Sequence, residues 1–107
     1  MAYRNRAAQS RAALAAVSGP VNSVVPAITG TKTVGQTLTC STGSWSNTPT
    51  YTYQWRRDGS AIAGATAATR VLAAGDAGAL MSCTVTATKA GVAQTATSAN
   101  TTAIAAA

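Results

Sequence analysis

Side chains that can move protons are scarce in this sequence. Its 107 residues include no His and only two acidic residues, Asp58 and Asp76. Paired-carboxylate catalysis and Ser-His catalysis both need groups that are missing here. Asp76 is followed closely by Gly78, which favours a role in a turn over a role as a base. The sequence therefore predicts a binding protein without catalytic residues.

Two cysteines, Cys40 and Cys83, are the remaining candidates for chemistry. A structural zinc site usually takes four ligands from Cys, His or carboxylate side chains. Two thiolates without a His or a nearby carboxylate fall short of that number, so we expect no metal site. No glycine loop followed by Lys is present to hold a phosphate, and we expect no bound cofactor.

Positive charge gathers at the start of the chain. The net charge is +6, and Arg4, Arg6 and Arg11 precede the first acidic residue, Asp58. A segment of this charge should attract an acidic partner. We therefore expect these three arginines, together with Tyr3, to be partner-binding residues.

Residues 1–20 are predicted to form a basic arm, extended or helical, in front of a folded domain at 21–107. Residues 1–18 lack Gly and Pro and are rich in Ala, which favours helix, but a helix this short is marginal in water without a surface to lie against. Ser18, Gly19 and Pro20 then mark the boundary. The apolar stretch at 12–17 is too short and too poor in Leu for a typical secretion signal, and no stretch approaches the roughly twenty apolar residues of a membrane span.

From Val21 onward the pattern is that of short strands separated by turns, typical of an all-β sandwich. Glycines lie at or near the breaks, and Arg57, Asp58 and Gly59 form a tight-turn signature. The strands are expected near residues 22–29, 36–42, 51–57, 61–63, 68–73, 79–89 and 92–103.

Alternation along these strands predicts which side chains face the core. Cys83 and Val85 lie in the apolar series of their strand, and Leu38 and Cys40 share one face of theirs. Trp55 can then meet both cysteines inside the sandwich. The large apolar core candidates are Ile28, Leu38, Trp45, Tyr51, Tyr53, Trp55, Ile62, Leu72, Leu80 and Val85.

The order Cys40, Trp55, Cys83 is that of the immunoglobulin core, in which two strands of opposing sheets are bridged beside a buried Trp. With the segments at 34–38, 43–45, 53–59, 61–66 and 76–78, residues 20–104 closely resemble bacterial and phage immunoglobulin-like domains. Met81 stands where antibody-type domains carry the Tyr of the tyrosine corner, so the resemblance is to the microbial branch. It implies a seven-strand immunoglobulin-like β-sandwich.

The same resemblance implies a disulfide between Cys40 and Cys83, which would stabilise the domain by about 3–4 kcal/mol in the chain-entropy model. The alternative is a pair of buried thiols, since a free Cys serves well as a small apolar core residue. Both possibilities remain open at this point.

The resemblance also implies a function. Domains of this Thr-, Ala- and Gly-rich type occur on phage particles, which suggests a virion structural protein, a capsid decoration or accessory protein. Its partner would be the major capsid protein or another virion protein in a multi-copy assembly at the capsid surface. The arm would dock onto an acidic neighbouring subunit and gain order there.

Two other functions compete with this one. An extracellular adhesion or glycan-binding module would use Trp45, Asn47 and Tyr51 to contact a cell-surface sugar, although Trp45 is expected to pack under the end of the sandwich instead. Nucleic-acid binding rests on charge alone, since no aromatic residues interleave the arm's arginines. Arg56 and Arg57 are expected to be solvated residues beside a turn. We do not expect a nucleic-acid or membrane partner.

Overall fold

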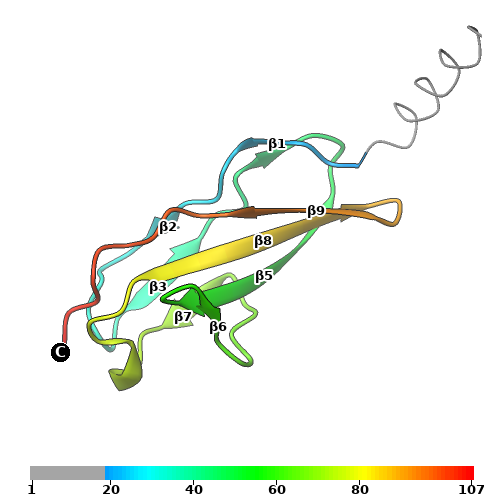
Figure 1. Cartoon of the computed structure of the whole chain (residues 1–107). Coiled ribbons are helices and arrows are strands. Elements are labelled where there is room, and N and C mark those ends of the chain that lie inside the picture. Colours follow the sequence, from blue (N-terminus) through cyan, green and yellow to red (C-terminus); the bar gives the residue numbers. More distant parts are fainter. Residues whose placement is uncertain (1–18) are drawn as a thin grey trace, which may run out of the picture.

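The computed structural model of the chain describes residues 19–107. The arm predicted at 1–20, with its partner-binding residues Tyr3, Arg4, Arg6 and Arg11, therefore lies almost wholly outside the described residues. The described part is all-β, with one 3₁₀ turn, η1 (Ala74–Asp76), between strands (Figure 1). The strands are β1 (Asn22–Val24), β2 (Ile28–Thr29), β3 (Thr37–Cys40), β4 (Ser44–Trp45), β5 (Thr50–Arg57), β6 (Ser60–Ala61), β7 (Thr69–Val71), β8 (Met81–Lys89) and β9 (Val92–Thr97).

The strands form three antiparallel sheets. A four-stranded sheet has the order β6-β5-β8-β9, a three-stranded sheet has the order β2-β3-β7, and β1 pairs with β4. The long β5–β8 ladder is the centre of the larger sheet, with Tyr53 opposite Val85 and Trp55 opposite Cys83. An isolated parallel bridge from Thr33 to Ala105 ties down the end of the chain.

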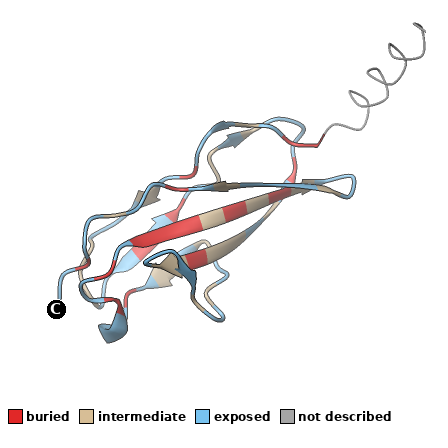
Figure 2. Ribbon diagram, viewed as in Figure 1, coloured by how far each residue is buried: buried red, intermediate tan, exposed pale blue. Residues whose placement is uncertain are grey.

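The core lies between the two larger sheets. Leu38 and Cys40 of β3 share one buried cluster with Trp55 of β5 and with Cys83 and Val85 of β8. Strand β8 is buried along most of its length (Figure 2). Because both sheets contribute to one core, they pack face to face as a β-sandwich.

Most of the predicted strands are confirmed, and most are shorter than expected, although β5 and β6 each begin one residue earlier, at Thr50 and Ser60. The expected strand at 22–29 is instead two short strands in different sheets, β1 and β2. They are separated by Pro26, which has no N–H to give to a ladder. The short strand β4 was not predicted. The last strand ends at Thr97, beyond which the Ser98 hydroxyl, not a backbone carbonyl, accepts the Cys83 N–H at 3.0 Å.

The predicted tight turn at residues 57–59 is confirmed. It joins β5 to β6, with Arg57 opposite Ser60. Asp58 and Gly59 both have positive φ, 50° and 86°, as the favoured two-residue hairpin turn requires.

Of the core candidates, only Leu80 is wrong, because its side chain is 37% exposed. It lies between the buried residues Ala79 and Met81, just before β8, and its side chain points outward. Ile104, which was not a candidate, is buried in the same cluster. The other candidates are fully buried (Leu38, Trp55, Leu72 and Val85) or partly buried against the cluster (Ile28, Trp45, Tyr51, Tyr53 and Ile62).

Candidate binding surfaces

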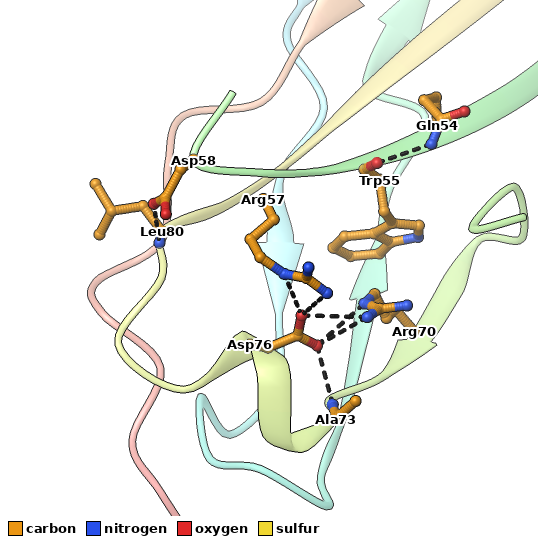
Figure 3. Close-up of polar contacts among 8 residues, drawn as sticks. All are labelled: Gln54, Trp55, Arg57, Asp58, Arg70, Ala73, Asp76 and Leu80. Atoms are coloured by element: carbon orange, nitrogen blue, oxygen red, sulfur yellow. Dashed lines mark hydrogen bonds and ion pairs between the residues drawn. The ribbon is translucent and has the colours of Figure 1, made fainter. Parts of the chain in front are cut away.

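Asp76, in η1, is the most heavily hydrogen-bonded acidic group of the domain (Figure 3). Its carboxylate is fully buried and accepts from Arg57 Nε at 2.8 Å, Arg70 Nη2 at 2.9 Å and the Ala73 N–H at 2.9 Å. Burial alone would raise the pKa of Asp76, but the Ala73 N–H and the two guanidinium groups outweigh it and lower the pKa. The carboxylate is thereby held as an anion in a structural role.

This network was only partly predicted. A turn role for Asp76 was expected, but its burial was not. Arg57, expected to be solvated, has a side chain that is 38% exposed and lies 2.7 Å from Asp76. Its neighbour Arg56 donates to the Thr84 hydroxyl and the Gly59 carbonyl. One signal in the sequence points to the pairing, namely that the domain has two acids for five cations, Lys32, Arg56, Arg57, Arg70 and Lys89.

The second acid, Asp58, is exposed and has a local partner. Its Oδ1 accepts from the Leu80 N–H at 2.9 Å, which ties the β5–β6 turn to the start of β8. The two carboxylates therefore belong to separate turns, as the sequence predicts.

Cys40 and Cys83 are both free thiols and both buried. Cys83 lies opposite Trp55 in the ladder, and all three residues share the core cluster. A hydrogen bond with Cys83, reinforced by burial, raises the pKa of the Cys40 thiol. The same hydrogen bond lowers the pKa of Cys83, although burial acts against it. The thiols are thus close enough to influence each other, and their oxidation to a disulfide stays a prediction.

The proposed sugar-contacting residues, Trp45, Asn47 and Tyr51, lie at one end of the sandwich. Trp45 packs against the core, as expected. Its Nε1 donates to the Thr42 carbonyl at 2.6 Å, and its ring is tilted on that of Tyr51 with centroids 6.5 Å apart. Asn47 Nδ2 donates to the Gly19 carbonyl at 3.1 Å. These contacts give all three side chains intramolecular roles.

At the same end, the first described residues are fixed to the domain. Gly19 and Pro20 are buried, and a Cβ on Gly19 would collide with Val92. The Val21 N–H donates to Ser46 Oγ at 2.9 Å. Residues 19–22, Trp45, Gln94 and Thr95 line a hollow of about 290 Å³ there. The chain therefore enters the domain at a defined place beside the β4–β5 loop.

Other kinds of site leave no trace in the described part. Within residues 19–107, no three His, Cys, Asp or Glu side chains gather as metal ligands would. No helix of this region has the length and hydropathy needed to cross a membrane.

Comparison of the chain with family models, with curated proteins and with solved structures finds no match.

Proposed function

We propose that the chain is a non-enzymatic virion structural protein, a phage capsid decoration or accessory protein. In this proposal residues 1–18 anchor it to the major capsid protein or another virion protein. Arg4, Arg6, Arg11 and Tyr3 make the contacts, and an immunoglobulin-like domain is displayed at the capsid surface in many copies. The observation that carries the proposal is the fixed entry of the chain at Gly19.

A fixed entry point makes an arm useful as an anchor. Gly19 is held by Asn47 and packed against Val92, and Val21 is bonded to Ser46. Because residues 19–21 are held to the domain, no flexible linker lies between residue 19 and the first strand, and a partner that docks residues 1–18 would keep the domain close to its own surface.

The immunoglobulin-like part of the proposal draws support from the sheet orders β2-β3-β7 and β6-β5-β8-β9. The immunoglobulin arrangement likewise divides its strands between two sheets, with a Trp and a Cys pair between them. Here Cys40 of β3 and Cys83 of β8 come from different sheets and share the core with Trp55.

The non-enzymatic part is supported by the state of the two acids. Asp76 is buried and paired with Arg57 and Arg70, so it has no free lone pair directed at a substrate. Asp58 accepts from a backbone N–H in a turn. Neither arrangement resembles a general base within reach of a substrate proton.

The alternative, an extracellular glycan-binding module, has less support. A sugar site needs an exposed aromatic face with polar groups free to bond hydroxyls. Here Trp45 packs against the core and Asn47 is bonded to Gly19. Nucleic-acid binding rests only on the excess of positive charge.

The test compares two variants of equal charge on capsid particles that lack the protein. One replaces Arg4, Arg6 and Arg11 with Gln, and the other replaces Lys32, Arg56 and Lys89, which avoid the Asp76 network. We expect the first to lose at least about tenfold in co-sedimentation at low salt, a loss that shrinks as added salt screens the arginines, and the second to bind nearly as wild type does. Equal losses from both variants, or undiminished binding after deletion of residues 1–18, would refute the arm as anchor.

A further inference from the structure

Strand β5 has an open edge. It pairs with β8 along its whole length but with β6 only at Arg56 and Arg57. The Trp55 N–H donates to Ala65 at 2.9 Å, and the Trp55 carbonyl accepts from Ile62 at 3.0 Å, so the backbone groups of Trp55 face away from β8. Alternate residues of an antiparallel strand point the same way. The backbone groups of Tyr51 and Tyr53 therefore also face outward, where no strand of residues 19–107 lies.

A hollow of about 630 Å³ runs along this edge. Its lining comes from residues 51–54 and 66–68 and from Thr86, and contains no charged side chain. Tyr51 and Tyr53 are only half-buried in it. Unpaired backbone groups beside uncharged, partly exposed rings are what a further strand would cover.

The opposite edge of the same sheet differs. Strand β9 has residues 19–22 beside it, and these form the hollow around Gln94 and Thr95. Access to that edge is therefore restricted by the chain itself. Residues 66–68 lie across the hollow from the β5 edge, but no strand of residues 19–107 pairs with that edge between Thr50 and Gln54.

We propose that two copies of the chain pair through their β5 edges, antiparallel and with Thr52 on the two-fold axis. The open run is symmetric about Thr52, because Tyr51 and Tyr53 lie on either side of it. In this register Tyr51 stands opposite Tyr53 of the partner subunit. Each such pair exchanges both backbone hydrogen bonds, so every open group of the two tyrosines is satisfied and the two sheets become one.

The flanking residues fit the same register. Beside Trp55 the edge is occupied by residues 62–65, so the partner strand has to end before it reaches that place. It does, because Thr50, the first residue of β5, stands opposite Gln54 in this register. The chain before Thr50 turns at Asn47 and Thr48, which both have positive φ, 66° and 44°. Non-Gly residues take such a conformation at turns.

The chemistry of the edge also suits a second copy. Tyr51 and Tyr53 from both subunits would lie on one face as cross-strand aromatic pairs, which stabilise a sheet. No charge is buried, so no desolvation of an ion opposes the contact.

Both domains carry a net positive charge, and salt should therefore strengthen the pairing by screening their repulsion. A single strand pair buries little area, so the dimer should be weak.

Disulfide trapping tests the register. Thr52 and Thr95 are both exposed and lie in one row of the sheet, each opposite Thr86. Two cysteines at position 52 would have Cα atoms about 4.5 Å apart across the axis, within the range of a disulfide. Under a mild oxidant, we expect Thr52→Cys to form a dimer at least about tenfold faster than the matched variant Thr95→Cys. Equal rates would overturn the proposed pairing. Cys40 and Cys83 are buried in the wild-type fold and should not compete with the introduced cysteine.

Sedimentation equilibrium gives a second, independent readout. We expect the wild-type chain to dimerise as its concentration approaches about 1 mM, more so at high salt. Thr52→Lys should abolish the dimer by placing two like charges opposite each other, and Thr95→Lys should leave it. Circular dichroism checks that both variants are folded. A wild-type chain that stays monomeric throughout would refute the pairing.

The pairing does not depend on the proposed capsid function. It is measured on the purified chain without particles, and its salt dependence has the opposite sign to that of the arm. The two proposals can therefore fail separately.

Discussion

Arg70 and Asp76 form an ion pair in which Arg70 Nη2 donates to both carboxylate oxygens, at 2.9 Å to Oδ2 and at 3.2 Å to Oδ1. Arg70 comes from β7 of the smaller sheet, while Arg57, from the end of β5 in the larger sheet, reaches the same carboxylate. One buried anion therefore fastens the two sheets together at one end of the sandwich. In this clamp, loss of the carboxylate charge would leave two guanidinium groups without a counter-charge, so the domain should be sensitive to changes at Asp76.

Replacing Asp76 tests this clamp. Asp76→Asn removes the anion but keeps the shape, which leaves two guanidinium groups facing each other without a counter-charge. We expect a loss of about 3 kcal/mol in the free energy of unfolding, measured by urea denaturation. The matched control Asp58→Asn affects an exposed turn residue and should cost less than about 1 kcal/mol. Similar losses from the two variants would contradict the clamp.

Acid should weaken the domain through the same residue. The pKa of Asp76 in the folded domain lies below its usual value of 3.8, so the folded state binds this proton less readily than the unfolded chain. The stabilisation is present above the unfolded pKa and is lost as pH falls through the lower folded-state pKa. We expect the unfolding free energy of wild type to decline below about pH 4.

Asp76→Asn is the control for this pH dependence. It should be less stable at neutral pH, and its unfolding free energy should fall less steeply in acid, since the only other carboxylate side chain of the domain, Asp58, is exposed. Parallel pH profiles for wild type and variant would show that another group is responsible.

Local pattern was enough to predict which side chains face the core. Leu38, Cys40, Cys83 and Val85 follow from a period of two residues, which depends only on neighbours along the strand. Sheet membership was harder, because it depends on distant partners. The apolar residues within segment 22–29 suggest one strand, yet Asn22 pairs with Trp45 and Ile28 with Cys40, in different sheets.

The binding surfaces were less predictable for the same reason. Asn47 looks like a free loop residue in the sequence, and Trp45 was expected only to pack under the end of the sandwich. The fold brings the Thr42 carbonyl to Trp45 and the Gly19 carbonyl to Asn47. The open edge of β5 likewise results from the shortness of β6. The predicted anchor residues Tyr3, Arg4, Arg6 and Arg11 lie outside the described residues and stay a prediction.

Oxidation of the buried thiols should stabilise the sandwich. A bond between Cys40 and Cys83 joins the two sheets and closes a long loop, for which the chain-entropy model gives about 3–4 kcal/mol. We expect protein refolded under oxidising conditions to unfold at a higher temperature than reduced protein. After denaturation it should show no titratable thiol. Two reactive thiols in the denatured, oxidised sample would contradict the bond, and Cys40→Ser with Cys83→Ser removes the difference if it arises from this pair.

The close approach of Gly19 to Val92 can be tested with a paired substitution. A Cβ on Gly19 would collide with the Val92 side chain, and Gly19 does not have positive φ, so the cost of Gly19→Ala is steric and not conformational. We expect that variant to lose about 1–3 kcal/mol, a typical cost of overpacking. Val92→Ala should cost less, and the double variant should recover much of the Gly19→Ala loss, because the smaller side chain makes room for the new methyl group.

Additive losses in that double-mutant cycle, measured by urea denaturation, would mean that the two residues do not interact. A recovery would establish that the entry of the chain is packed against β9, as the anchoring proposal needs. The same variants separate orientation from attachment, because Gly19→Ala keeps every arginine of the arm. If the arm attaches the domain and the packed entry orients it, Gly19→Ala should retain co-sedimentation with particles but blur the domain in averaged images of them.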